Sequence, residues 1–189
     1  ARLGHVLFYD PEYYFYNPME IIKVHKGGLA SHGGVIGIFV SMFYFCRKYN
    51  FNFMWFADRV CYCIAFGVGF IRIGNFFNSE IIGTPTSVPW AVIFTAKDNL
   101  PRHPSMLYEA ASYFILFGIL TLMKRRWKGN IPEGKFLGFL FMYIFTARFF
   151  IEYVKIDQVA FEDGMFLNMG QILSIPMALF CVVFFTGFY

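Results

Sequence analysis

The sequence predicts an all-α, polytopic integral membrane protein, in which a bundle of membrane-spanning helices surrounds an outward-facing polar cavity. Of its 189 residues, 58% are hydrophobic, 22% are aromatic and only 15% are charged. The mean hydropathy is +0.52, which is more apolar than a soluble domain of this size requires. Apolar runs of about 20 residues, the length that crosses a bilayer as a helix, recur along the whole chain.

Five apolar runs are predicted to form complete transmembrane helices. They cover residues 29–46, 55–77, 106–123, 136–154 and 167–189. Residues 1–9 have the character of the end of a further helix, and we expect N-terminal sequence, including at least one more membrane segment, to precede Ala1. We interpret residues 1–189 as a single membrane domain. The proline-containing segment 78–105 is its outward-facing loop region.

Basic residues predict the orientation of these helices. The two strongest clusters, residues 47–48 and 124–128, follow the first and third runs and are therefore two crossings apart. The positive-inside rule places both clusters in the cytoplasm. The loops at 10–28, 78–105 and 155–166 then face outward. The net charge of +4 is small and gives no indication of nucleic-acid binding.

In this orientation, the polar side chains in or beside the apolar runs fall in the outer half of the membrane. They are His32, Arg72, Asn75, Glu80, Arg102, His103, Tyr108, Glu109, Arg148, Glu152, Asn168 and Gln171. A charged side chain inside the bilayer costs about 2.5 kcal/mol or more. One shared polar cavity explains this clustering better than independent snorkelling of each side chain. We expect the inner half to be almost uniformly apolar.

Two arginines are the candidate binding residues for an anion. Arg72 and Asn75 are three residues apart on one helix face, and Arg148 and Glu152 are four apart. A guanidinium group stays charged and meets phosphate oxygens with a planar fork. We therefore expect Arg72 and Arg148 to clamp a phosphate, with Glu152 positioning Arg148. The alternatives are that Arg72 only snorkels to the interface and that Arg148 and Glu152 neutralise each other.

The other candidates also have a structural alternative. His32 is either a helix cap or a general base, since an imidazole of pKa about 6.5 can accept a proton from a thiol. Ser105 is expected to be the N-cap of the third long helix. Glu109 either belongs to the site or favours the dipole of that helix. Gln171 either contacts substrate or forms hydrogen bonds between helices.

The four cysteines give no indication of a metal site. Cys46, Cys61, Cys63 and Cys181 all lie in apolar runs. Because Cys61 and Cys63 are two residues apart on a helix, they point to different faces and are poorly placed to share a metal or a disulfide. We expect all four to be small buried hydrophobic residues, and we expect no metal and no cofactor.

Several blocks of this sequence together resemble the bacterial prolipoprotein diacylglyceryl transferase family. The blocks are residues 32–37 (HGGVIG), 72–83 (RIGNFFNSEIIG), 102–109 (RHPSMLYE), 148–152 (RFFIE) and 169–176 (MGQILSIP), with residues 2–5 resembling an earlier arginine–glycine block. They stand in the family's order and span nearly the whole chain. Two positions depart from the family pattern. Ile71 stands where the family has a glycine. Ile144 stands where the family has a tyrosine, and the nearest tyrosine in this chain is Tyr143.

The resemblance implies an enzyme of the bacterial inner membrane with its active site toward the outer leaflet. Such an enzyme transfers the diacylglyceryl group of phosphatidylglycerol to the lipobox cysteine of a prolipoprotein signal peptide, forming a thioether and releasing glycerol-1-phosphate. Its implied catalytic residues here are His32, Arg72 and Arg148. The residues implied to bind or orient substrate are Arg72, Asn75, Glu80, Arg102, His103, Tyr108, Glu109, Glu152 and Gln171.

The alternative function is a transporter or binding protein for an anionic solute or lipid, built on the same basic cavity. Transporters are commonly assembled from inverted repeats that place a binding site near the middle of the membrane. This sequence has no internal repeat that we can detect, and its inner half is almost uniformly apolar. The pattern therefore favours the transferase.

The predicted orientation can be tested by labelling. Asp98→Cys and Lys128→Cys, each in a background without the native cysteines, should react with a membrane-impermeant thiol reagent from opposite sides of the membrane. We expect Asp98→Cys to react from outside. Labelling of both positions from one side would exclude the outward-facing cavity.

Overall fold

The structure, a computed structural model, describes residues 1–27, 30–156 and 175. The side chains of Lys26, Ser31 and His32 lie outside this description, as does the predicted fifth span at residues 167–189 apart from Ile175. The chain divides into two compact units, Ala1–Phe56 and Ala57–Tyr189. Each unit is described by itself.

The described part of the first unit contains two short helices, two 3-10 turns and a long helix. These are α1 (Arg2–Phe8), α2 (Pro11–Tyr16), η1 (Pro18–Glu20), η2 (Val24–Lys26) and α3 (Ser31–Tyr49). Proline begins both α2 and η1, where its fixed φ angle suits the first turn and its missing N–H is not needed. Asn50 ends α3 in the left-handed conformation, with φ 55°.

Arg2 holds the segment between α2 and α3 against α1. Its guanidinium donates hydrogen bonds to the carbonyl oxygens of Ile21 at 3.0 Å, and of Glu20 and Gly27 at 2.6 Å each. The same group lies 5.0 Å from the centre of the Tyr14 ring. One arginine thereby ties three backbone carbonyl groups of this irregular segment to α1.

The helices α1 and α3 cross at a pair of glycines. A Cβ atom on Gly4 would lie 2.8 Å from the Cα of Gly33, and one on Gly33 would lie 2.9 Å from the Cα of Gly4. These distances leave no room for a side chain on either residue. Gly4 belongs to the block at residues 2–5, and Gly33 belongs to the block at residues 32–37. Helix packing therefore explains why each of these blocks has a glycine at that position.

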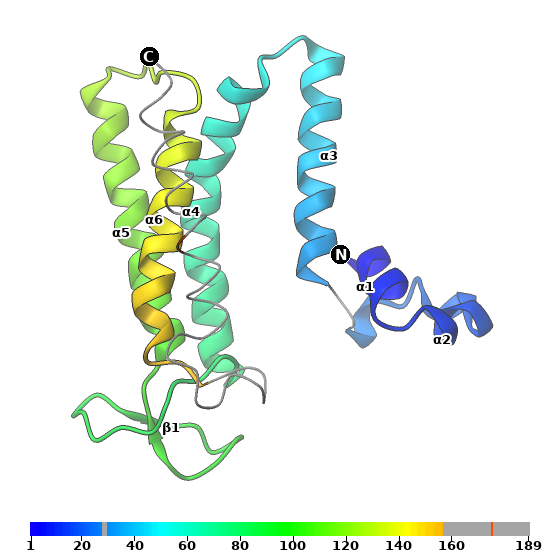
Figure 1. The fold of residues 1–189 in the computed structure, drawn as a ribbon, viewed down its shortest axis with the longest axis vertical. Helices are drawn as coiled ribbons and strands as arrows, with labels where there is room; N and C mark the ends of the chain where they lie inside the picture. The colour runs from blue at the N-terminus through cyan, green and yellow to red at the C-terminus, as the bar shows by residue number, and fades with distance from the viewer. Residues whose placement is uncertain (28–29, 157–174, 176–189) are drawn as a thin grey trace. The chain divides into compact units, whose positions relative to one another are not determined.

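The described part of the second unit is a bundle of three helices with a loop region at one end (Figure 1). The long helices are α4 (Phe53–Phe77), whose first turn belongs to the first unit, α5 (Ser105–Arg126) and α6 (Lys135–Glu152). Between α4 and α5, strands β1 (Val92–Ile93) and β2 (Pro101–Arg102) pair antiparallel. Four of the predicted runs are therefore helical, with ends that agree to about one turn.

Two of these helices, α4 and α5, are long and apolar enough to cross a membrane. Helix α6 is equally apolar on average but is not counted among them, because its 18 residues include three charged side chains, those of Lys135, Arg148 and Glu152. The protein is thus mostly helical, with two candidate membrane spans in the part of the chain that the structure describes. The complete five-span bundle stays a prediction.

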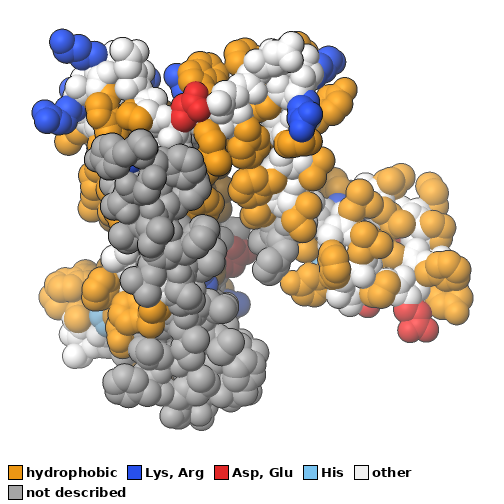
Figure 2. All heavy atoms as spheres, turned by 45° about the horizontal axis from the view of Figure 1, so that its top comes forward, with side chains coloured by type: hydrophobic (Ala, Val, Ile, Leu, Met, Phe, Trp, Pro, Cys, Tyr) orange, Lys and Arg blue, Asp and Glu red, His pale blue; other side chains and the backbone are white. Residues whose placement is uncertain are grey.

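The apolar core of the bundle lies toward the end at which α4 begins. Its buried members are Cys61 and Ala65 from α4, Leu116 and Leu120 from α5, and Phe136 and Leu140 from α6. Lysine and arginine end α5 on the same side, and Figure 2 shows basic side chains gathered at helix ends beside largely apolar surface. The apolar core therefore occupies the end of the bundle at which α4 begins.

The cysteines follow the prediction only in part. Cys46 and Cys61 are buried, but Cys63 is exposed, so the prediction of a buried Cys63 is wrong. The physical reason is helical geometry, because a residue two positions from the buried Cys61 points away from the core. Cys181 lies outside the described residues.

One buried carboxylate lies at the end of the bundle that contains the apolar core. Asp58 of α4 is fully buried. It accepts hydrogen bonds from the backbone N–H groups of Gly134 at 2.7 Å and Leu137 at 2.9 Å. The first N–H groups of a helix have no partner within the helix, and the helix dipole favours an anion beside them. Asp58 therefore caps α6 from a neighbouring helix.

Asp58→Asn should lower the free energy of unfolding by about 2 kcal/mol or more. The amide removes the charge and turns an N–H group toward backbone donors. Thermal unfolding in detergent micelles measures the change. Asp10→Asn is the matched control, because Asp10 is exposed and makes no capping hydrogen bond at α2. If both variants unfold at the wild-type temperature, the cap does not stabilise α6.

Candidate active site

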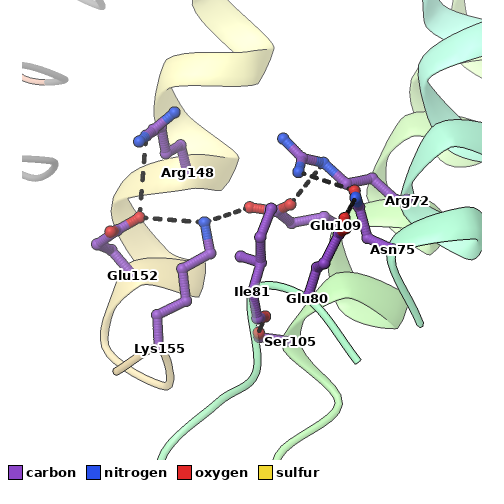
Figure 3. Close-up of polar contacts among 9 residues, drawn as sticks. All are labelled: Arg72, Asn75, Glu80, Ile81, Ser105, Glu109, Arg148, Glu152 and Lys155. Atoms are coloured by element: carbon purple, nitrogen blue, oxygen red, sulfur yellow. Dashed lines mark hydrogen bonds and ion pairs between the residues drawn. The ribbon is translucent and has the colours of Figure 1, made fainter. Parts of the chain in front are cut away.

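A continuous chain of polar contacts lies at the end of the bundle opposite the apolar core (Figure 3). The side chains come from the last turns of α4 and the loop after it, the first turns of α5, and the end of α6. In order of contact they are Glu80, Asn75, Arg72, Glu109, Lys155, Glu152 and Arg148. The structure thus brings together most of the charged residues that the sequence singled out on these helices.

Arg72 is bound on two sides. Its Nε lies 2.7 Å from Oε2 of Glu109, and its Nη1 donates to Oδ1 of Asn75 at 3.3 Å. The Nε and Oε2 atoms are buried but make no aligned hydrogen bond, so charge attraction holds this pair. Asn75 in turn donates to Oε2 of Glu80 at 2.6 Å. The predicted shared face of Arg72 and Asn75 is confirmed, and Arg72 has a specific partner, which snorkelling alone does not require.

Lys155 joins two buried glutamates. Its Nζ lies 2.5 Å from Oε1 of Glu109 and 3.4 Å from Oε2 of Glu152. The exposed fractions of these three side chains are 4%, 7% and 6%. Buried charges are tolerated when each has an opposite charge beside it. Glu109 therefore lies between two cations. Its contacts are specific ion pairs, and a favourable interaction with the dipole of α5 does not by itself account for them.

Arg148 is the loosely bound end of the chain. Its Nε lies 3.8 Å from Oε2 of Glu152, which is beyond hydrogen-bonding distance, and its side chain is 45% exposed. The predicted pairing of Arg148 with Glu152 is confirmed as an ion pair, although Lys155 lies closer to the same oxygen. The Arg148 guanidinium therefore keeps most of its hydrogen-bonding groups for another partner.

The two arginines line one cavity between α4, α5 and α6. It is small and partly open to solvent, and its other lining residues are Glu109, Ser112, Tyr113, Tyr143, Ile144, Ala147 and Ile151. The Ser112 hydroxyl donates to the Tyr143 hydroxyl at 3.3 Å. A cavity with cationic, hydroxyl and aliphatic walls suits an anionic group attached to an apolar body.

One of the two departures from the family pattern lies in this cavity. Ile144 stands where the family has a tyrosine, but Tyr143 and Ile144 both line the cavity. The phenol at this position is therefore displaced by one residue without leaving the cavity. The other departure, Ile71, is 61% exposed and does not crowd a helix contact in the described bundle.

Arg102, His103 and Tyr108 do not join the chain of ion pairs. The Nη2 of Arg102 lies 2.5 Å from Oδ2 of Asp98. This hydrogen-bonded pair lowers the pKa of Asp98 and raises that of Arg102. The Tyr108 hydroxyl lies 3.0 Å from Nδ1 of His103 and accepts a hydrogen bond from Trp90 at 2.8 Å. These contacts order the loop region between α4 and α5, and a role in substrate binding stays a prediction.

A glycine lets this loop pass beside Lys155. Gly83 donates to the His103 carbonyl at 2.9 Å, and Thr84 donates to the Val154 carbonyl at 2.9 Å. A Cβ atom on Gly83 would lie 2.5 Å from the His103 oxygen and 2.6 Å from the Val154 oxygen. Because both neighbours are backbone atoms, neither can rotate away. The close approach pairs Gly83 with Lys155 and so positions the lysine among the glutamates.

The prediction that Ser105 is the N-cap of α5 is wrong. Pro104 occupies the cap position, and the Ser105 hydroxyl donates instead to the carbonyl of Ile81 at 2.6 Å. Ile81 has φ 57°, a left-handed conformation that is strained for a β-branched residue. Ser105 thus holds a strained turn directly after Glu80.

Lys155, Ser112 and Tyr113 belong to the site but were not among the predicted site residues. A signal existed, because Lys155 follows Glu152 by three residues and Tyr113 follows Glu109 by four, which are helix-face spacings. The predicted residue Gln171 and the side chain of His32 lie outside the described part of the chain.

The fold and the site define a mostly helical protein with two candidate membrane spans and with buried ion pairs beside a cavity lined by two arginines. The family model described as prolipoprotein diacylglyceryl transferase matches residues 1–186. The chain therefore belongs to the prolipoprotein diacylglyceryl transferase family, as its sequence blocks predicted, and it is a transferase.

Relatives named phosphatidylglycerol--prolipoprotein diacylglyceryl transferase agree with this assignment. The protein of Tolumonas auensis is 47% identical over 97% of this chain and 71% of its own length. That of Chloroherpeton thalassium is 46% identical over 97% and 69%. That of Bacteroides fragilis is 43% identical over the whole of this chain and 72% of its own length.

Gly83→Ala should lower transferase activity by about tenfold or more, because the added methyl group must separate the backbones that position Lys155. Activity and thermal unfolding should be measured together. Gly118→Ala on α5 is the matched control, since a Cβ there meets nothing within 4 Å in the described structure, and we expect it to be neutral or slightly stabilising. Full activity of Gly83→Ala would mean that the loop adjusts without moving the site.

Proposed function

We propose that this protein transfers the diacylglyceryl group of phosphatidylglycerol to the lipobox cysteine of a prolipoprotein, and that its cavity binds the lipid phosphate. The relatives support the reaction, since their names state both substrates. The observation that carries the assignment of the site is that Arg72 and Arg148, from two different helices, line one cavity. Two guanidinium groups on one cavity suit a phosphodiester.

The reaction exchanges a C–O bond for a C–S bond. The cysteine thiolate attacks the glyceryl carbon attached to the phosphate oxygen, and the electron pair of the broken bond leaves with that oxygen. A phosphodiester with a single negative charge becomes glycerol-1-phosphate, a phosphomonoester, and gains negative charge as the bond breaks. The thiol proton must pass to a base, because the thiolate is the nucleophile.

Arg72 and Arg148 are suited to stabilise this growing charge. Oriented donors around a developing anion are most effective when they are placed before the reaction begins. Arg72 meets this condition, since Glu109 and Asn75 hold it from two sides. Within the described structure, Arg148 pairs with Glu152 at 3.8 Å and is 45% exposed, so its guanidinium can turn toward a bound phosphate.

The remaining substrate roles rest on the sequence. We propose His32 as the base that accepts the thiol proton. Arg102, His103 and Tyr108 are proposed to border the route by which the substrates enter, and Gln171 is proposed to contact a substrate.

We also propose a multi-pass protein of the bacterial inner membrane with its site toward the outer leaflet. Arg72 and Arg148 lie at the end of the bundle opposite the basic last turn of α5, which contains Lys124, Arg125 and Arg126. If that basic turn faces the cytoplasm, as the positive-inside rule requires, the cavity faces outward. A secreted prolipoprotein presents its cysteine on that side.

Arg148→Lys should lower kcat/KM by about 100-fold or more. Lysine keeps the charge but loses the planar fork that binds two phosphate oxygens. The assay is the mass increase of a lipobox peptide incubated with phosphatidylglycerol and the protein in detergent micelles. Arg126→Lys, an exposed substitution at the opposite end of the bundle, is the control and should keep wild-type activity.

Two results would count against this proposal. Wild-type protein that binds phosphatidylglycerol but never modifies the peptide would favour a lipid-binding protein over a transferase. Near-normal transfer by Arg148→Lys would show that Arg148 serves only as a partner of Glu152.

A further inference from the structure

Lys155 is the most buried cation of the site. Its exposed fraction is 4%, compared with 21% for Arg72 and 45% for Arg148. The cavity lining includes both arginines but not Lys155, so its ammonium group faces the glutamates instead of the cavity. A lysine in this place acts on a ligand through its neighbours.

The charges of the residues in direct ion-pair contact do not balance. Among the described residues, Arg72, Lys155 and Arg148 form ion pairs with two carboxylates, Glu109 and Glu152, while the exposed Glu80 reaches Arg72 through Asn75. This ion-paired set therefore has one positive charge left over, which matches a ligand with a single negative charge. Without Lys155 the set would be neutral, with one arginine beside each buried carboxylate.

Lys155 also occupies the carboxylates. Its Nζ contacts Oε1 of Glu109 while Arg72 contacts the other oxygen, and it shares Oε2 of Glu152 with Arg148. A cationic headgroup that entered the cavity would need a carboxylate to bind, since a buried ammonium without an anion is unfavourable. In the described part of the site, Lys155 already holds both buried carboxylates, and the exposed Glu80 accepts a hydrogen bond from Asn75.

We propose that Lys155 determines the headgroup specificity of the site. By neutralising Glu109 and Glu152, it leaves Arg72 and Arg148 available for a phosphodiester with an uncharged headgroup. By occupying those glutamates, it denies them to the ammonium of a zwitterionic phospholipid. Lys155 is thus a positioning residue that selects phosphatidylglycerol over phosphatidylethanolamine. This inference rests on the proposed phosphate site.

The test compares the two lipids on matched variants. Dissociation constants for phosphatidylglycerol and phosphatidylethanolamine are measured separately in neutral detergent micelles, for wild type, Lys155→Met, Lys155→Arg and Lys97→Met. Lys97 is an exposed lysine of the loop region between α4 and α5 and is the control. Thermal unfolding of each variant is recorded in the same detergent.

The expected result is a change in preference. Lys155→Met should weaken phosphatidylglycerol binding by about tenfold or more, while phosphatidylethanolamine binding stays the same or improves, so that the ratio of the two constants falls by about tenfold or more. Lys155→Arg keeps the charge and should keep the ratio, and Lys97→Met should match wild type. If Lys155→Met weakens both lipids in parallel, the lysine only holds the fold together, and the proposal is overturned.

A double variant covers the case in which Lys155→Met does not fold. Lys155→Met with Glu152→Gln removes one cation and one carboxylate, so the site regains a single excess positive charge. The proposal expects recovery of the preference for phosphatidylglycerol, and a folded double variant without that preference would overturn it. Wild-type protein that binds neither lipid would instead count against the proposed phosphate site itself.

Discussion

The pairing of Glu109 with Arg72 and Lys155 is the interaction on which the rest of the site depends. A charge inside a membrane protein has little water to solvate it, so it persists only beside an opposite charge. Glu109 belongs to α5, Arg72 to α4 and Lys155 to the residues that follow α6. One carboxylate therefore joins α5 to α4 and to the residues that directly follow α6, so the assembly of the site depends on the packing of those helices.

The two ends of the bundle bury a carboxylate in opposite ways. Asp58 accepts hydrogen bonds from backbone N–H groups of α6, which are fixed in position and have no capacity for a further partner. Glu109 is held by side-chain cations, and a guanidinium has five N–H groups, of which a single carboxylate uses only some. The first arrangement closes the structure, whereas the second leaves donors for a ligand. This difference explains why chemistry is expected at one end only.

Residue spacing predicted the parts of the structure that depend on neighbours along the chain. The apolar runs indicated the four described long helices, and the three- and four-residue spacings indicated Arg72 with Asn75 and Arg148 with Glu152. Spacing could not indicate that the partners of Asp58 lie on α6, because no local pattern reports which helix end will pack beside a given carboxylate. The close approach at Gly83 was hidden for the same reason, since its neighbours come from distant segments.

The site combines one fixed arginine with one adaptable arginine, and the proposed reaction needs both. Before the C–O bond breaks, the phosphate has a single negative charge and must enter the cavity, which an exposed and loosely bound Arg148 permits. As the bond breaks, the charge grows, and donors that are already oriented stabilise it without further rearrangement. Arg72 has that orientation because Glu109 and Asn75 restrain it. A site with two restrained arginines would admit the lipid less easily, and one with two loose arginines would stabilise the leaving phosphate less well.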